Sequence, residues 1–392
     1  EDAEQGRARF VRIADRVARW YAPAVHILAA ATFAGWLLFG IAGWQVALLH
    51  AVAVLIITCP CALGLAVPVV QVVASGRLLK RGILLRSGDA LERLAAIGTV
   101  MFDKTGTLTM GRPVLTNHDE IPDACHAVAR NLAAASLHPL ARAVQAALGP
   151  GEPPADAREV AGCGVTATID GATWRLGRRD WCGAAQRPAR ETGSELWLSR
   201  DGEPLAGFTF DDDVRPDAAR TIDTLLARGL RIELLSGDRC EVVDRVGDAL
   251  GIARRRGGVS PTEKVARLRQ LEAEGRRVLM VGDGLNDAPA LAAAYASMSP
   301  ASAADVSQIQ ADLVFQGDRL EPVVTALTVA RRADRLTKQN VGMAILYNAI
   351  AVPFAMAGLV TPLVAAIAMS SSSLLVTTNA LRLKRGEADE AA

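Results

Sequence analysis

The sequence has almost no net charge and no regular cysteine spacing. Its 43 Lys and Arg residues balance 42 Asp and Glu residues, so it lacks the basic surplus typical of nucleic-acid-binding proteins, and we expect no nucleic-acid partner. Its six cysteines do not follow the pattern of a small secreted domain held by disulfides. By contrast, 51% of the residues are hydrophobic, and long stretches near both ends carry no charge.

Four apolar stretches are long enough to cross a bilayer, which takes about 20 residues. They are 22–43, 44–75, 338–358 and 362–382, and short connections join them into two hairpins. Cationic residues flank only the outer ends of each hairpin, which by the positive-inside rule places both chain ends and the middle in the cytoplasm. The sequence therefore predicts a multi-pass protein of the cell membrane, with the lipid bilayer as a partner. Buried helices of a soluble protein are the alternative.

Residues 99–318 alternate short apolar strands with helical patterns, which is typical of a parallel sheet covered by helices. Three predicted strands each end at an acidic or hydroxyl-bearing loop. The strands are Thr99–Phe102, Arg231–Leu235 and Arg277–Val281, and their loops begin at Asp103, Ser236 and Gly282. Because the carboxyl ends of parallel strands meet at one edge of a sheet, we expect these loops to converge.

The first of these loops has the sequence Asp103-Lys104-Thr105-Gly106-Thr107-Leu108-Thr109. A carboxylate that attacks phosphorus needs hydroxyl and N–H donors and a metal ion, because these offset the repulsion between two anions. Asp283 and Asp287 in the last loop add hard oxygen ligands of the kind that Mg²⁺ prefers. Lys264, near the start of a predicted helix, could supply a cation. The sequence therefore predicts a site of phosphoryl transfer with Asp103 as the nucleophile.

A segment of about a hundred residues, 111–206, separates the first two of these strands. It has a helical pattern over Asp123–Leu148, followed by strand-like pieces around Gly162 and Gly164. We interpret it as a small α+β domain inserted into the sheet domain. His138 lies on a helix of this insert, where a lone histidine is more often structural than ligand-binding.

The tripeptide Cys59-Pro60-Cys61 lies near the middle of the second apolar stretch. Residues i and i+2 of an intact helix point about 200° apart, so the two thiols would diverge. Pro60 removes a backbone N–H and clashes with the preceding turn, so we expect the helix to open and both sulfurs to face one point. Two thiolates suit a soft ion such as Cu(I) or a borderline one such as Zn²⁺. Two structural cysteines beside a kink are the alternative.

Polar side chains in the last two apolar stretches offer partners to these cysteines. Tyr347 and Asn348 lie in the middle of the third stretch, and Met369 is followed by a run of serines in the fourth. No Asp, Glu, Lys or His lies mid-span in either stretch, which favours a monovalent ion over a divalent one. Hydrogen bonding between neighbouring helices is the alternative role for the serines and Asn348.

Together these motifs resemble the heavy-metal-transporting (type IB) P-type ATPases over nearly the whole chain. The residues that carry the resemblance are Cys59-Pro60-Cys61, Asp103 to Thr109, His138-Pro139, Ser236-Gly237-Asp238 and Gly282 to Asp287. Tyr347-Asn348, and Met369 with Ser373 four residues later, are similar to the copper(I) subgroup. The sequence from Met369 to Leu383 most resembles members tied to the assembly of haem–copper oxidases.

The resemblance implies a multi-domain fold: an α-helical transmembrane bundle, an α/β haloacid-dehalogenase-like phosphorylation domain and an inserted α+β nucleotide-binding domain. The implied boundaries are 1–98 for a transmembrane hairpin with a cytoplasmic extension, 99–110 and 207–318 for the phosphorylation domain, 111–206 for the nucleotide-binding domain, and 319–392 for a C-terminal transmembrane hairpin.

The resemblance also implies ATP-driven export of Cu(I) through an aspartyl phosphate on Asp103, with ATP and Mg²⁺ as cofactors. A cytoplasmic copper chaperone could supply the ion. The residues implied at the phosphoryl group and the nucleotide are Lys104, Thr105, His138, Gly162, Gly164, Ser236, Gly237, Asp238 and Lys264. The implied Mg²⁺ ligands are Asp103, Thr105 and Asp283, oriented by Asp287. The implied copper ligands are Cys59, Cys61, Tyr347, Asn348, Met369 and Ser373.

The sequence departs from the family pattern in three places. Leu137 stands where the family usually has Glu, and Ser236 replaces the commoner Thr. The sequence contains neither a Thr-Gly-Glu loop nor a Cys-x-x-Cys module. We therefore expect the chain to be the C-terminal part of a longer pump, with the N-terminal part and its actuator domain as the missing partner.

Three other functions remain open at this stage. The chain could be a membrane-tethered haloacid-dehalogenase-like phosphohydrolase with structural cysteines, although such an enzyme would not need the large insert. It could also be a Zn/Cd-type pump. The third alternative is a metal-binding membrane protein without catalysis. In that case the three acidic loops would have no common function and would occur together by coincidence.

Overall fold

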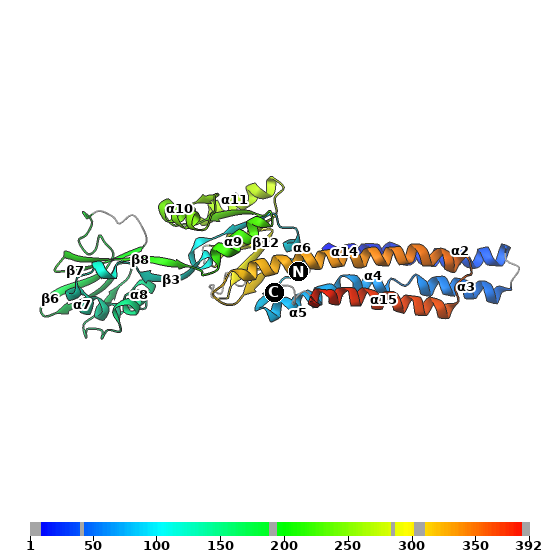
Figure 1. Cartoon of the computed structure of the whole chain (residues 1–392), viewed down its shortest axis with the longest axis horizontal. Coiled ribbons are helices and arrows are strands. Elements are labelled where there is room, and N and C mark those ends of the chain that lie inside the picture. Colours follow the sequence, from blue (N-terminus) through cyan, green and yellow to red (C-terminus); the bar gives the residue numbers. More distant parts are fainter. Residues whose placement is uncertain (1–8, 40–42, 188–193, 284–286, 302–309, 386–392) are drawn as a thin grey trace.

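The computed structural model describes residues 9–39, 43–187, 194–283, 287–301 and 310–385. They form three parts in a row along the long axis of the molecule (Figure 1). An antiparallel-sheet domain lies at one end, a parallel-sheet domain in the middle and a bundle of long helices at the other end. The predicted multi-domain fold is therefore confirmed.

The bundle holds the predicted apolar stretches as helices. Its members are α2 (Arg9–Phe39), α3 (Trp44–Ile57), α4 (Cys61–Ala66), α5 (Pro68–Lys80), α14 (Glu321–Met356) and α15 (Pro362–Arg385). The segments Trp44–Lys80 and Pro362–Lys384 are long and apolar enough to cross a membrane, whereas Pro23–Phe39 is a shorter apolar helix. The multi-pass topology and its orientation stay predictions. Residues 40–42 of the first predicted connection lie outside the described residues.

The middle domain is built on a seven-stranded sheet in the order β1-β13-β12-β11-β2-β9-β10. The strands are β1 (Ile83–Leu85), β2 (Thr99–Phe102), β9 (Arg231–Leu235), β10 (Arg255–Arg256), β11 (Val278–Val281), β12 (Ala296–Pro300) and β13 (Leu313–Phe315). All pairs are parallel except β1 with β13. Because β2 lies between β11 and β9, the loop that follows it starts at the centre of the sheet edge.

Helices cover both faces of this sheet. They are α6 (Ala90–Ala95), α9 (Ala218–Ala227), α10 (Cys240–Ala249), α11 (Pro261–Ala273) and α12 (Ala288–Ala293). Val100 and Phe102 of β2 pack in a large core with α6, α9 and the first half of α14, whereas Met101 packs in a smaller core with α11. Since α14 runs on into the bundle, one continuous helix joins the sheet domain to the apolar helices (Figure 1).

The third part is an antiparallel sheet in the order β3-β8-β7-β6-β5-β4 with two helices. Its elements are β3 (Thr109–Leu115), α7 (Asp123–Ala133), α8 (Pro139–Leu148), β4 (Arg158–Val160), β5 (Gly164–Ile169), β6 (Ala172–Gly177), β7 (Ser194–Arg200) and β8 (Glu203–Val214). The single helical pattern predicted over Asp123–Leu148 is two helices, because Pro139 begins a new one.

Two predicted boundaries differ from the structure. β1 lies within the residues assigned to the transmembrane part, yet it pairs with β13, so the sheet domain begins before residue 99. The insert is longer than 111–206 at both ends, because β3 and β8 pair from Thr109 opposite Val214 onward. Both differences arise from strand pairing between distant segments, which the local sequence pattern does not reveal.

Candidate phosphorylation and ion-binding sites

The predicted nucleophile lies where β2 ends at the sheet edge. Asp103 is 5% exposed, and its backbone N–H donates to the carbonyl of Val281 at 2.9 Å. The ammonium of Lys264 donates to Asp103 Oδ1 and to Asp287 Oδ1, each at 2.6 Å. Lys264 is placed by α11, which begins with a capping box formed by Ser260. The structure therefore brings three of the predicted site residues into direct contact.

Asp283 completes a cluster of three carboxylates. Oxygen atoms of Asp103, Asp283 and Asp287 all lie within 4.8 Å of one another. The loop of Asp103 approaches Asp283 so closely that a Cβ on Gly106 would lie 1.6 Å from Asp283 Oδ2. Gly106 also has a φ of +66°, which favours glycine. Residues 284–286 of the predicted motif lie outside the described residues.

The electrostatics of the cluster reflect three carboxylates close together, of which Asp103 and Asp287 share the ammonium of Lys264. Burial raises the pKa of Asp103 to about 7, and Asp287 adds to the rise while Lys264 opposes it. Burial and the neighbouring Asp287 also raise the pKa of Asp283 to about 7. Burial alone would lower the pKa of Lys264, but its contacts with Asp103 and Asp287 raise it. The negative charge of the three carboxylates therefore exceeds the positive charge that the neighbouring side chains supply.

The residues of this cluster fit a magnesium ion. Oδ2 of Asp287 is buried and has no hydrogen-bond partner among the described residues. Hard cations prefer carboxylate oxygens, and a divalent ion would relieve the crowding of negative charge described above. We therefore keep Asp103, Asp283 and Asp287 as candidate Mg²⁺ ligands, with Thr105 as predicted.

The opposite wall of the site is a network around Asp238. Its Oδ2 accepts hydrogen bonds from the hydroxyls of Thr105, at 3.2 Å, and Ser236, at 3.0 Å. Lys104 forms an ion pair with the same oxygen at 2.9 Å. Burial would raise the pKa of Asp238, but these donors, led by Lys104, lower it. Thr105, Ser236 and Asp238 line a cavity of about 530 Å³ together with Gly237 and Asp103.

Two residues that support the loop were missed by the sequence reasoning. The buried guanidinium of Arg215 donates to the carbonyls of Thr107, at 2.7 Å, and Gly106, at 2.8 Å. Asp212 accepts from the hydroxyl of Thr109 and from backbone N–H groups of the strand that follows. Asp212 lies near the end of β8 and Arg215 directly follows that strand, and the run of three aspartates before Val214 was the available signal.

The three residues predicted to bind nucleotide lie in the antiparallel domain. His138 is exposed and caps α8, where its Nδ1 accepts from the N–H of Leu140 at 3.3 Å. Gly162 and Gly164 both have positive φ and flank the turn between β4 and β5. Ser136 donates to Glu159 of β4 at 2.7 Å, which links the loop of His138 to that hairpin. The nucleotide role of these residues stays a prediction.

The second site lies where the membrane helix opens. Helix α3 ends at Ile57 and α4 starts at Cys61, so the backbone breaks around Pro60 as the sequence predicted. The sulfurs of Cys59 and Cys61 converge, and the structure joins them as a disulfide. Thiolate ligands would require the reduced form of this pair.

The helices that carry the other predicted copper ligands pack around this break. Both α14 and α15 contact α3 and α4. Tyr347 packs with the cluster that contains Val54 and Ile57, just before the break. Asn348 Oδ1 is buried and has no hydrogen-bond partner in the described part of the chain.

The remaining two predicted copper ligands lie one turn apart on α15. Met369 and Ser373 are both half-buried, and the Ser373 hydroxyl donates to the Met369 carbonyl at 3.3 Å. This bond belongs to a single helix and brings no other helix into the site. Coordination of copper by either residue therefore stays a prediction.

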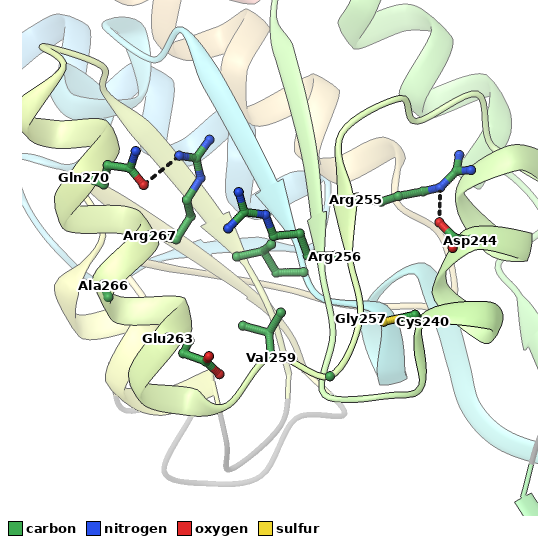
Figure 2. A pocket seen from close by; sticks show the side chains of 12 residues that line it. Cys240, Asp244, Arg255, Arg256, Gly257, Val259, Glu263, Ala266, Arg267 and Gln270 are labelled. Carbon is green, nitrogen blue, oxygen red and sulfur yellow. Dashed lines mark hydrogen bonds and ion pairs between the residues drawn. The ribbon is translucent and has the colours of Figure 1, made fainter.

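A second cavity, of about 520 Å³, borders the phosphorylation site and shares with it the loop 258–259. Figure 2 shows its walls, where Arg255 is held by Asp244 at 2.7 Å. Arg267 forms an ion pair with Glu233 at 2.8 Å. Two of the arginines in these walls are therefore already paired with carboxylates, and the candidate catalytic groups lie in the neighbouring cavity.

Comparison with known proteins identifies the family. A family model described as haloacid dehalogenase-like hydrolase matches residues 97–294. The chain belongs to this family. It is 53% identical to the nitrogen fixation protein FixI of Rhizobium leguminosarum bv. viciae over 98% of this chain and 51% of that protein. It is 41% identical to a copper-exporting P-type ATPase of Mycobacterium tuberculosis (strain ATCC 25618 / H37Rv), over 98% of this chain and 52% of that protein.

A solved structure agrees with these relatives. The crystal structure of a zinc-transporting PIB-type ATPase in its E2.Pi state matches with a TM-score of 0.78 and 30% identity, over 98% of this chain and 66% of that one. The resemblance to heavy-metal P-type ATPases is therefore confirmed. The chain spans about half the length of the curated relatives that it matches. The oxidase-assembly branch stays a prediction.

Proposed function

We propose that this chain carries the phosphorylation site and the ion-binding site of an ATP-driven pump that exports Cu(I) across the cell membrane. The observation that carries the proposal is the contact of Asp103 with Lys264 inside a cavity lined by Asp283 and Asp287. A simple phosphohydrolase would not need the antiparallel domain or the opened membrane helix. The similarity to copper-exporting relatives also supports a pump.

In the proposed reaction, a carboxylate oxygen of Asp103 forms a bond to the γ-phosphorus of ATP, and the bond between that phosphorus and the bridging oxygen of ADP breaks. ADP leaves with the electron pair of that bond. The ammonium of Lys264 stays beside Asp103 and balances negative charge there. The hydroxyls of Thr105 and Ser236, which donate to Asp238 in this structure and line the same cavity as Asp103, would donate to phosphate oxygens. A bound Mg²⁺ would neutralise charge on the transferred group.

The transported ion would bind at Cys59 and Cys61 in their reduced form. The apolar surroundings favour a monovalent ion, because α14 and α15 carry no charged side chain between Lys338 and Arg382. Asn348, whose buried oxygen is unsatisfied, and Tyr347 are the nearest candidates for further contacts on α14. Met369 and Ser373 are the candidates on α15. A cytoplasmic copper chaperone is the proposed donor of the ion.

Labelling of the full-length protein with γ-labelled ATP tests the phosphorylation. We expect an acid-stable, hydroxylamine-labile label that is lost in Asp103→Asn. The matched control is Asp123→Asn, on an exposed residue of α7 far from the cavity, which should keep the label. An unlabelled wild-type protein, or a labelled Asp103→Asn variant, would contradict the proposal.

Metal-dependent ATP hydrolysis tests the ion. We expect stimulation by Cu(I) that is lost in Cys59→Ser and in Cys61→Ser, while Cys240→Ser, on an exposed cysteine of the sheet domain, keeps it. Stimulation by Zn²⁺ in place of Cu(I) would identify a Zn/Cd-type pump. ATP hydrolysis that neither Cu(I) nor Zn²⁺ stimulates, and that both cysteine variants retain, would instead favour a phosphohydrolase with structural cysteines.

A further inference from the structure

A third cavity, of about 370 Å³, lies where the sheet domain meets the helical bundle. It is formed by α9, the first turns of α14 and the residue that follows α5. Four arginines from these separate segments line it, together with two carboxylates: Arg81, Arg220, Arg228, Arg319, Asp217 and Glu321. None of these residues belongs to the phosphorylation site or the cysteine site.

The two carboxylates of this cavity are engaged in local structure. Asp217 accepts from the backbone N–H groups of Leu320, at 3.0 Å, and Glu321, at 2.8 Å, so it caps the start of α14. The carboxylate of Glu321 accepts from the hydroxyl of Thr325 one turn later. Neither carboxylate forms an ion pair with an arginine of the cavity among the described residues.

Most of the positive charge in the cavity is therefore unpaired. Arg228 donates to the Val324 carbonyl at 3.5 Å and to the Thr328 hydroxyl, which fixes its guanidinium against α14. Arg81, Arg220 and Arg319 form no side-chain hydrogen bond or ion pair within the part of the chain that the structure describes. With four guanidinium groups and two carboxylates in its lining, the cavity carries a net positive charge that favours an anion.

The walls of the cavity come from both the sheet domain and the bundle. Arg81 directly follows α5, the last helix of the apolar segment Trp44–Lys80. The helix that forms another wall, α14, continues from the cavity into the bundle (Figure 1). The cavity is thus bounded by both parts of the molecule, and its last lining residue on α14, Thr328, lies ten residues before the predicted membrane stretch 338–358.

We propose that this cavity binds the phosphate group of an anionic ligand. Guanidinium groups bind phosphate oxygens through paired, charge-assisted hydrogen bonds. Proteins therefore often bind a doubly charged phosphate ester with several arginines. A phospholipid headgroup and a soluble phosphate ester present the same chemistry to this site. Such a ligand would connect the end of α5 with α9 and so bind the membrane helices to the sheet domain. The proposal does not depend on the transported ion.

Titration calorimetry on the full-length protein in phosphatidylcholine nanodiscs tests the site with two probes. Dioctanoyl phosphatidic acid carries a phosphate monoester on a lipid, and glycerol 3-phosphate carries the same group without acyl chains. We expect the Arg220→Gln/Arg319→Gln variant to weaken binding by about tenfold or more, since charge-assisted bonds are lost. Arg269→Gln, on an exposed arginine of α11, is the matched control and should bind as the wild type does.

The outcomes separate the two sources of phosphate. Equal binding of both probes, lost in the double variant, supports a site for a soluble phosphate ester. Binding of the lipid probe alone, again lost in the double variant, supports a headgroup site. The proposal is overturned if neither probe binds the wild type, or if the double variant binds as the wild type does. Arg81→Gln is a second variant from another segment, and a melting curve for each variant shows that it is folded.

Discussion

The candidate phosphorylation site and the cysteine site of this chain are built in opposite ways. Lys264 and Asp103 are 161 residues apart in the sequence, and the sheet brings them to 2.6 Å. Cys59 and Cys61 are separated by two positions, and one proline between them is enough to let their sulfurs converge. In this chain, the candidate site for a hard ion and phosphate combines charged side chains from distant segments. The candidate site for a soft ion is formed by two residues at a local break in one helix.

The two sites also differ in how their environment stabilises them. At Asp103 the carboxylates are buried together, so each depends on the cation that faces it. Around the cysteines the helices meet through packing and a few polar ties, such as Asn340, whose amide donates to the carbonyls of Ala66 and Val376. Substitutions in the first site should therefore have larger effects than substitutions in the second.

The largest effect is expected for Lys264→Met. It leaves Asp103 and Asp287 buried without their shared cation, and breaking a buried ion pair costs about 3 kcal/mol of stability. Phosphorylation should also fall by about a hundredfold or more, because a group that balances charge at the reacting oxygen is lost. Chemical unfolding and labelling with ATP measure the two effects. Lys264→Arg should recover part of both, and a fully active Lys264→Met protein would contradict the assigned role.

The next effect is expected for Gly106→Ala. The new Cβ would collide with Asp283, and the positive φ adds strain of about 1 kcal/mol. We expect the apparent affinity for Mg²⁺, measured from the Mg²⁺ dependence of phosphorylation, to fall by about tenfold or more, since about 1.4 kcal/mol of lost binding is tenfold. Gly251→Ala is the matched control, because Gly251 has a similar φ but open space around it. Equal losses in both variants would show that strain alone acts.

A smaller and more selective effect is expected for Pro60→Ala. Restoring a backbone N–H favours an unbroken helix, in which the two thiols point apart. We expect the affinity for Cu(I), measured by competition with a chelator on the reduced protein, to fall by about tenfold, which corresponds to about 1.4 kcal/mol. Pro353→Ala, in α14, is the control for a proline within a long helix. Unchanged affinity in Pro60→Ala would mean that tertiary packing alone opens the helix.

The smallest effect is expected for Asn340→Ala. The fully buried amide links α14 to α4 and α15, and it also accepts from Asn379 at 2.8 Å. Polar ties between membrane helices are worth about 0.6 kcal/mol on average, so the loss of stability should be near 1 kcal/mol. Thermal melting of the detergent-solubilised protein measures it, with the exposed Gln339→Ala as control. A loss of stability as large as that of Lys264→Met would contradict the expectation that substitutions around the cysteines have the smaller effects.

Much of the phosphorylation site could be predicted from sequence because its motifs follow strands. The strand Thr99–Phe102 has the predicted bounds, and β11 starts one residue later than predicted, at Val278. Arg215 and Asp212 were missed because their partners lie about a hundred residues earlier in the chain and are mostly backbone groups, to which the local sequence gives no guide. The extent of the insert was underestimated for the same reason, since β3 and β8 are defined by pairing with each other.

The sequence by itself determined which loop carries the candidate nucleophile and where the apolar helix opens. Both features depend on residues within one or two turns of each other, where the geometry of proline, glycine and short strands acts directly. Only the tertiary structure decided that Lys264 is shared by two carboxylates, that Gly106 touches Asp283, and that four arginines from separate segments surround one hollow. These contacts depend on the order and register of strands and on helix packing, which join residues far apart in the chain.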